Sequence, residues 1–258
     1  MTAPTPGSAE RGGFFAFHGP MAPGVRVMRR LSMPVKALLV VTAFMVPLGM
    51  LGWFYWANAG SQIEFAEQER RGVEWLDAWT PALRAAHDHR AMVGRVAAGD
   101  AAASAAVAGA QDRWQAAIAR LADVDKRLGD ALQTGSRLAE LQRTMQAATA
   151  STARPGEVHD AAVAALLSAG AAVGDSSNLV LDPDLDAFYL MQTAVIEGPG
   201  LVDALARARD AGAAVGAGTG AAAVAAMRTL AEAASVARVG ADRQRTGLAR
   251  ASASNAAL

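Results

Sequence analysis

The chain has 258 residues with 24 basic and 24 acidic side chains. It therefore lacks the overall positive charge that attracts proteins to nucleic acid, and we expect no nucleic-acid partner. Cysteine is absent, which excludes disulfides, thiolate catalysis and cysteine-ligated metals. Hydrophobic residues make up 52% of the chain but aromatic residues only 5%. Alanine dominates the apolar fraction, and this predicts an all-α fold.

The N-terminal part predicts a tail followed by a membrane anchor. Residues 1–34 are rich in Pro, Gly, Ser and Ala without a sustained period, which predicts a disordered tail. Residues 35–59 are expected to form a transmembrane helix, because the twenty residues from Ala37 to Trp56 carry no charge and span about 30 Å as a helix. The aromatic run at residues 53–56 replaces the small-residue cleavage site of a signal peptide, so we expect an uncleaved anchor.

The charges on either side of this segment predict its orientation. Four basic residues precede it, and acidic residues share the other side with two arginines: Arg26, Arg29, Arg30 and Lys36 before, and Glu64, Glu67, Glu69, Arg70 and Arg71 after. The excess of basic residues places the N-terminus in the cytoplasm. Residues 60–258 are then expected to lie outside the cytoplasm.

Residues 60–258 predict an antiparallel up-and-down bundle of four to six helices. The predicted helices cover residues 62–98, 101–150, 157–181, 183–211 and 219–251. Gly99 and Asp100 are expected to end the first, and Gly129 or Gly135 to split the second. The fourth is expected to begin with Asp182 as N-cap and Pro183 at its first position, and to be kinked at residues 198–200. Residues 212–220 are expected to form a flexible turn between helices.

The last predicted helix has no stop signal after it, and no second apolar span follows the first. We therefore expect the sequence to be the front part of a longer product.

Two residues of the first bundle helix are predicted to face the interior. Leu76, Leu83 and Arg90 recur every seven residues, with His87 beside them. A buried arginine needs a partner, either an acid such as Asp182 or Asp186 or an anionic ligand. Tyr189 is predicted to pack in the core or to line a pocket beside Arg90. The candidate ligand-binding residues are therefore Arg90, His87, Tyr189 and Asp186.

The sequence predicts no metal, cofactor or catalytic site. The aspartates at 182, 184 and 186 alternate as in calcium loops, but helix capping explains them better. His87 and His89 lie on different faces of a helix, and His159 has no evident partner, so a zinc site is not expected. The glycines of residues 212–220 follow no strand, which excludes a dinucleotide fingerprint. Nothing resembles a catalytic triad or a phosphate-binding loop, so we expect a protein that is not an enzyme.

The order of tail, membrane helix and helical bundle, together with two segments, resembles the sensor regions of bacterial methyl-accepting chemotaxis proteins. The segments are FAEQERRGVEWL at residues 65–76 and SNLVLDPDLDAFYLM at residues 177–191. The resemblance covers roughly residues 35–250. One departure is that His89-Arg90-Ala91 stands where the family has His-Arg-Gly.

This resemblance implies a function and a location. It implies a bundle in the periplasm, anchored in the bacterial inner membrane, that acts as a homodimer and relays the occupancy of a small-molecule ligand across the membrane. A second membrane helix and a signalling module would follow in such receptors. Two alternatives stay open: the input region of a membrane-bound histidine kinase or diguanylate cyclase, and a single-pass helical scaffold without a signalling role.

Overall fold

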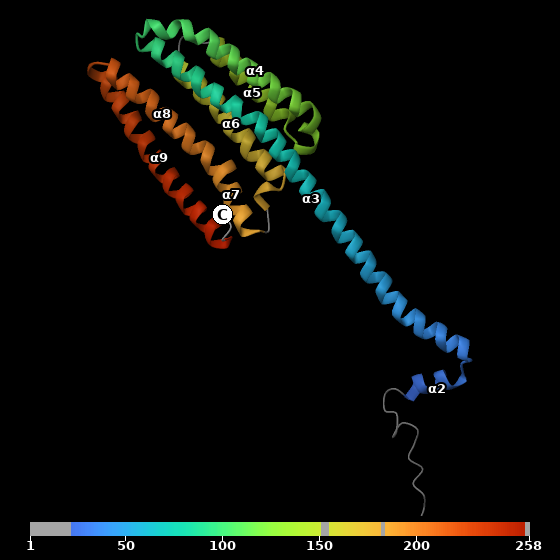
Figure 1. The fold of residues 1–258 in the computed structure, drawn as a ribbon. Helices are drawn as coiled ribbons and strands as arrows, with labels where there is room; N and C mark the ends of the chain where they lie inside the picture. Colours follow the sequence, from blue (N-terminus) through green and yellow to red (C-terminus); the bar gives the residue numbers. More distant parts are fainter. Residues whose placement is uncertain (1–21, 151–154, 182–183, 256–258) are drawn as a thin grey trace, which may run out of the picture. The chain divides into compact units, whose positions relative to one another are not determined.

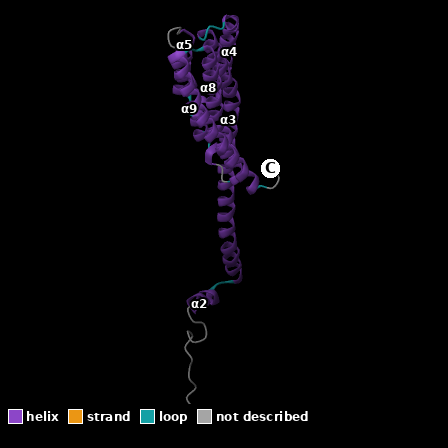
Figure 2. Ribbon diagram, turned by 90° about the vertical axis from the view of Figure 1, so that its left-hand side faces the viewer, coloured by secondary structure: helices purple, strands orange, loops and turns teal. Residues whose placement is uncertain are grey.

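The fold was described from a computed structural model, which covers residues 22–150, 155–181 and 184–255. Within these residues all regular structure is helical and no strand occurs (Figure 2). This confirms the predicted all-α class. The elements are α2 (Ala22–Arg30), α3 (Met33–Ala97), α4 (Ala101–Leu132), α5 (Gly135–Ala150), α6 (Pro155–Ser176), a 3₁₀ turn (Leu179–Leu181), α7 (Leu185–Met191), a π-helical segment (Gln192–Glu197), α8 (Gly198–Ala217) and α9 (Gly220–Ser254).

The chain divides into two compact units, residues 1–62 and residues 63–258. The first contains α2 and the beginning of α3. Of the helices in the described part of the chain, α3 is the one that is long and apolar enough to cross a membrane. Its apolar side chains from Leu38 to Trp56 have no protein neighbours to bury them; Phe44, for example, is 74% exposed. Such a surface is costly in water and suits a lipid environment.

The second unit is a helical bundle (Figure 1). Among its described residues, six helices of sixteen residues or more take part: α3, α4, α5, α6, α8 and α9. This number lies within the predicted range of four to six. The main core lies between the bundle part of α3 and α4, α5 and α6, where Trp75, Trp79, Trp114 and Leu121 are buried.

Two of the buried tryptophans of this core have hydrogen-bond partners for their indole nitrogens, whereas that of Trp114 has none. The indole Nε1 of Trp75 donates to Asp125 Oδ1 over 2.8 Å, and that of Trp79 donates to the Leu166 carbonyl over 2.8 Å. Asp125 also accepts a hydrogen bond from the Thr134 hydroxyl. The helices α3 and α6 also approach each other closely at this point. A methyl group added at Gly170 of α6 would lie only 2.7 Å from the Trp79 ring of α3.

The hairpin of α8 and α9 packs differently from the rest of the bundle. Among the described residues, none of either helix belongs to the main core. The buried apolar side chains of the two helices are Pro199 and the alanines at positions 204, 206, 211, 233, 237 and 251. Each alanine removes little apolar surface from water compared with a leucine or tryptophan. Hydrophobic burial therefore holds this hairpin less strongly than it holds α3 to α6.

Several predicted helix ends are confirmed. Gly99 has φ of 93°, a conformation that favours glycine, and ends α3. Asp100 is the N-cap of α4, and its carboxylate accepts hydrogen bonds from the amides of Ala102 and Ala103 at 3.1 and 3.3 Å. The predicted split of the second helix falls at Gln133, with φ of 55°, so that Gly135 begins α5.

Other boundaries were predicted wrongly. The helix expected over 157–181 ends at Ser176, because Asn178 adopts φ of 64° and a 3₁₀ turn follows. Instead of a kink at residues 198–200, the structure has the π-helical segment just before them. The turn expected over 212–220 is confined to Gly218 and Thr219, since α8 continues to Ala217.

Two predictions concern residues that are described in part or not at all. Residues 22–30, expected to lack regular structure, form α2, whereas residues 1–21 lie outside the described residues. The proposed cap Asp182 and Pro183 also lie outside them. The N-cap of α7 is Asp184, whose side chain makes no capping hydrogen bond.

Candidate functional site

Arg90 lies inside the bundle, as its seven-residue spacing from Leu83 predicts. It is 7% exposed and projects from the last third of α3. A guanidinium removed from water in this way is stable only when its charge is compensated and its N–H groups are bonded. The surrounding helices supply that compensation.

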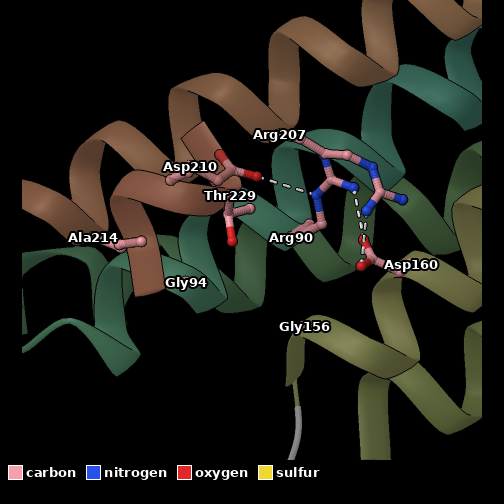
Figure 3. A pocket seen from close by; sticks show the side chains of 10 residues that line it. Arg90, Gly94, Gly156, Asp160, Arg207, Asp210, Ala214 and Thr229 are labelled. Atoms are coloured by element: carbon pink, nitrogen blue, oxygen red, sulfur yellow. Dashed lines mark hydrogen bonds and ion pairs between the residues drawn. The ribbon is translucent and has the colours of Figure 1, made fainter. Parts of the chain in front are cut away.

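Three aspartates from two other helices bind Arg90, and Figure 3 shows Asp160 and Asp210 among them. Its Nε donates to Asp210 Oδ2 over 3.1 Å, and its Nη1 donates to Asp160 Oδ1 over 3.1 Å and to Asp203 Oδ1 over 3.2 Å. Asp160 belongs to α6, and Asp203 and Asp210 belong to α8. Arg90 therefore joins α3 to both helices.

A second arginine completes the arrangement. Arg207 Nε donates to Asp203 Oδ2 over 2.8 Å, and its Nη1 donates to Asp160 Oδ2 over 3.0 Å. Partial burial acts to lower the pKa of Arg207, but Asp203 and Asp160 outweigh it and raise the pKa. We call Arg90, Asp160, Asp203, Arg207 and Asp210 the arginine cluster.

The arginine cluster is close to electrical neutrality. Its two arginines and three aspartates sum to −1, and Arg209, which donates to Asp210 Oδ1 over 2.9 Å, brings the sum to zero. One donor stays unused, because Arg90 Nη2 is buried and has no hydrogen-bond partner. An unmade bond of this kind costs about 1–3 kcal/mol.

A pocket of about 250 Å³ borders the cluster, with walls from α3, α6, α8 and α9. Arg90, Asp160, Arg207 and Asp210 form its charged side, as Figure 3 shows. Its other walls are small side chains such as Ala211, Ala214, Ala226 and Thr229. The pocket can hold only a small group, and its charged side offers both signs of charge.

His87 lies one turn before Arg90 and is 4% exposed. Its Nδ1 is 3.8 Å from Asp203 Oδ1, too far for a hydrogen bond, and neither ring nitrogen has a hydrogen-bond partner. Burial, followed by the positive charge of Arg90, lowers its pKa from 6.5 to about 4. The ring is therefore neutral at pH 7 and forms no ion pair with Asp203.

The other two predicted ligand residues lie elsewhere in the bundle. The Tyr189 ring packs against Phe188 and lies 5.6 Å from the Arg250 guanidinium carbon, on α9. Asp186 accepts a hydrogen bond from Asn255 Nδ2 over 2.7 Å, and this bond lowers the pKa of the Asp186 carboxyl. The structure thus brings Arg90 and His87 together but separates both from Tyr189 and Asp186.

The prediction that Arg90 pairs with an acid is confirmed, but Asp186 is not that acid. Asp186 precedes α8, whereas the acids that bind Arg90 lie well inside that helix and on α6. Asp182 lies outside the described residues. The true partners have a detectable signal, since Asp203, Arg207 and Asp210 recur at helical spacing on an otherwise alanine-rich helix.

A second polar cluster in the core escaped the sequence analysis. His89 Nδ1 lies 2.7 Å from His159 Nε2, and the Trp114 ring stacks on His159 and is tilted against His89. His159, expected to have no partner, therefore has one on α3. Burial, and then the neighbouring His159, lower the pKa of His89 to about 4. Seventy residues separate the two histidines, and no local pattern reveals such a pair.

No grouping of three metal-ligating side chains occurs within the described ranges. No family model, curated protein or solved structure matches the chain.

Proposed function

We propose that this chain is the sensor region of a transmembrane signalling receptor, most closely comparable to a chemoreceptor, with its bundle in the bacterial periplasm. The observation that carries the proposal is the composition of α3. This single helix includes both the uncharged segment suited to a membrane and Arg90 of the arginine cluster. A change in the contacts of Arg90 would therefore act on the same helix that enters the membrane.

The packing of the bundle supports this role. The α8–α9 hairpin buries mainly alanine, and the arginine cluster forms its polar connection to α3 and α6. Closely packed interfaces of this kind have discrete arrangements and do not deform continuously. A ligand that binds unequally to two arrangements of the hairpin would shift their populations, which is the requirement for a sensor. Two such bundles acting as a homodimer would transmit the shift as a small displacement of helices.

The first test is the topology in the membrane. Because the chain has no cysteine, an introduced cysteine is the one site in it that a maleimide can label. Single cysteines are introduced at Ser8, in the N-terminal segment, and at Ser104, which is exposed on α4. A maleimide that does not cross the inner membrane is added to cells with a permeabilised outer membrane. We expect Ser104→Cys to be labelled and Ser8→Cys to be labelled only after lysis. The reverse pattern would refute a periplasmic bundle.

Signalling is the second test. Residues 1–258 replace the corresponding region of a chemoreceptor, and the activity of the receptor-coupled kinase is measured in membranes. Arg90→Gln and Asp210→Asn are expected to shift kinase activity, because each breaks the cluster between α3 and α8. Arg70→Gln is the matched control, since Arg70 is an exposed arginine of α3 without an ion pair in the described part of the bundle. If all three variants leave the activity unchanged, the cluster does not take part in signalling.

A further inference from the structure

A second pocket lies between α3 and α8 and shares no lining residue with the one beside the arginine cluster. Its volume of about 580 Å³ falls within the range typical of small-molecule sites, about 300–1,000 Å³. The pocket beside the cluster, at about 250 Å³, falls below that range. The larger pocket is therefore the better candidate for holding a whole ligand.

The walls of this α3–α8 pocket are mostly apolar. Trp79 and Leu83 line it from α3, and Pro199, Val202 and Leu205 line it from α8. Val202 and Leu205 are about half exposed, at 51% and 53%. An apolar ligand body would remove these surfaces from water, at roughly 25 cal/mol for each Å².

Two arginines flank the apolar walls. Arg84 lines the pocket and has no hydrogen bond or ion pair with any other described residue. Arg209 lines it from α8 and donates to Asp210 from Nε and to the His87 carbonyl from Nη2. Its Nη1 makes no hydrogen bond within the described bundle. The pocket thus offers the guanidinium of Arg84, which has no ion-pair partner among the described residues, and the unbonded Nη1 of Arg209.

One acid limits the charge that the pocket accepts. Asp88 also lines it, one turn after Arg84. The three charged groups of the lining, Arg84, Arg209 and Asp88, sum to +1; Asp210, which pairs with Arg209 and balances its charge, lies outside the lining. This net charge matches one negative group, whereas a second would meet Asp88 at close range and be repelled.

His87 is the independent sign that the pocket is built for a ligand. It lines the pocket, is more than nine-tenths buried, and has two ring nitrogens without a hydrogen-bond partner. A structural core would satisfy these atoms or replace the residue with an apolar one. A neutral imidazole has one donor and one acceptor for a polar atom that enters when the side chains adjust.

From these contacts we infer that the α3–α8 pocket binds a small monocarboxylate with an apolar body, with its carboxylate between Arg84 and Arg209 and its body against Trp79 and the α8 side chains. This deepens the proposed function, on which it rests, by naming the class of ligand that the sensor takes. The carboxylate forms charge-assisted hydrogen bonds to guanidinium groups, and these are stronger than bonds between neutral groups.

Benzoate is the probe for this inference, measured by isothermal titration calorimetry on the full chain in nanodiscs. We expect saturable binding of about one benzoate for each chain. Acetate lacks the apolar body, benzyl alcohol lacks the charge, and phthalate carries a second charge, so each should bind at least about tenfold more weakly. Equal binding of acetate would overturn the inference, because it would indicate attraction to charge alone. Absence of benzoate binding at millimolar concentrations would also overturn it.

Substitutions of exposed residues test where benzoate binds, and they break no core packing. Arg84→Gln should weaken benzoate binding about tenfold, and Val202→Trp should abolish it by filling the pocket. Arg70→Gln, on the same helix but outside the pocket, should leave it unchanged. Benzoate binding that survives both Arg84→Gln and Val202→Trp lies elsewhere and refutes the assignment.

The two proposals fail in different ways. If benzoate binds with the expected pattern but the hybrid receptor does not respond to Arg90→Gln, the pocket assignment stands and the receptor function fails. If the hybrid receptor responds but benzoate does not bind, only the ligand class is wrong.

Discussion

His89 and His159 form a hydrogen bond of 2.7 Å between Nδ1 and Nε2, and both rings are almost completely buried. One ring must donate a proton and the other must accept it, so the accepting nitrogen of the pair is unprotonated. Protonation of the accepting nitrogen would place two donors face to face in an apolar core beside Trp114. His87, the third buried histidine of the described bundle, is also neutral, with a pKa of about 4.

The stability of the bundle should fall as the pH is lowered from about 6.5 towards 4. In the unfolded chain His87 and His89 have pKa values of 6.5, whereas in the folded chain burial lowers both to about 4. The unfolded state therefore binds more protons in this interval, and acid favours it. Each histidine should contribute on the order of 2 kcal/mol of destabilisation at pH 5. Urea unfolding followed by circular dichroism at pH 7.5, 6.5 and 5 measures the effect.

His87→Leu separates the two contributions. The His87 ring makes no hydrogen bonds, so the substitution should not lower stability at pH 7.5 and should remove about half of the loss between pH 7.5 and pH 5. His18→Gln, in the N-terminal segment, should leave the loss unchanged. A loss that is the same in His87→Leu and in the wild type would contradict the assigned protonation state.

Arg90 should be among the most sensitive positions of the bundle. Arg90→Met leaves the largely buried Asp203, whose side chain is 13% exposed, with one cation fewer, and should destabilise the protein by about 3 kcal/mol. Asp203→Leu added to Arg90→Met should recover part of this loss, because no uncompensated charge then lies between α3 and α8. Arg95→Met breaks the exposed pair with Asp100 and should cost less than about 1 kcal/mol. A double variant that loses the full sum of the single losses would show that the two residues do not interact.

Two glycine substitutions should have effects of opposite sign. Gly170→Ala on α6 would place a methyl group against the Trp79 ring and should destabilise by about 1–3 kcal/mol through overpacking. Gly212→Ala on α8 meets nothing within 4 Å and should stabilise by about 0.5–1 kcal/mol, because alanine has the higher helix propensity. Thermal unfolding monitored at 222 nm distinguishes the two, and destabilisation by Gly212→Ala would contradict the described position of α8.

Charge placed in the apolar part of α3 should prevent membrane insertion. Leu38 and Leu48 are 65% and 62% exposed within the protein, so their replacement breaks no packing. An arginine near the centre of a membrane helix, where Leu48 lies, costs about 2.5–3.5 kcal/mol, and one near its end, at Leu38, costs less. Leu38→Arg combined with Leu48→Arg should therefore move the chain from the membrane fraction to the soluble or aggregated fraction. The matched double variant Leu38→Ala with Leu48→Ala should stay in the membrane fraction. If both double variants leave the membrane fraction, misfolding and not the introduced charge explains the result.

Much of the helical architecture was predictable because its signals are local. The uncharged residues after Ala37, the cap at Asp100 and the seven-residue spacing of Leu83 and Arg90 each depend on a few neighbouring side chains. The early end of α6 depends on Ser177, which is fully buried and lies against Gly72 of α3, so it is a tertiary effect. The partners of Arg90 are 70 to 120 residues away, and only the packing of α6 and α8 decides which acids reach it.

The π-helical segment explains why Tyr189 does not share a face with the acids of α8. In an uninterrupted α-helix, Tyr189 and Asp203 would be fourteen residues apart, almost four full turns, and would lie in one row. The segment Gln192–Glu197 widens one turn and so holds about one residue more than α-helical geometry would allow. That surplus residue turns everything after it by roughly 100° about the helix axis. The Thr193 carbonyl accepts the backbone amide of Gly198 and also a hydrogen bond from Gln244 Nε2 of α9 over 2.7 Å. Deleting one residue here would rotate Asp203 and Asp210 away from Arg90. The electrostatic contact between α3 and α8 therefore depends on an irregular segment that lies outside both helices.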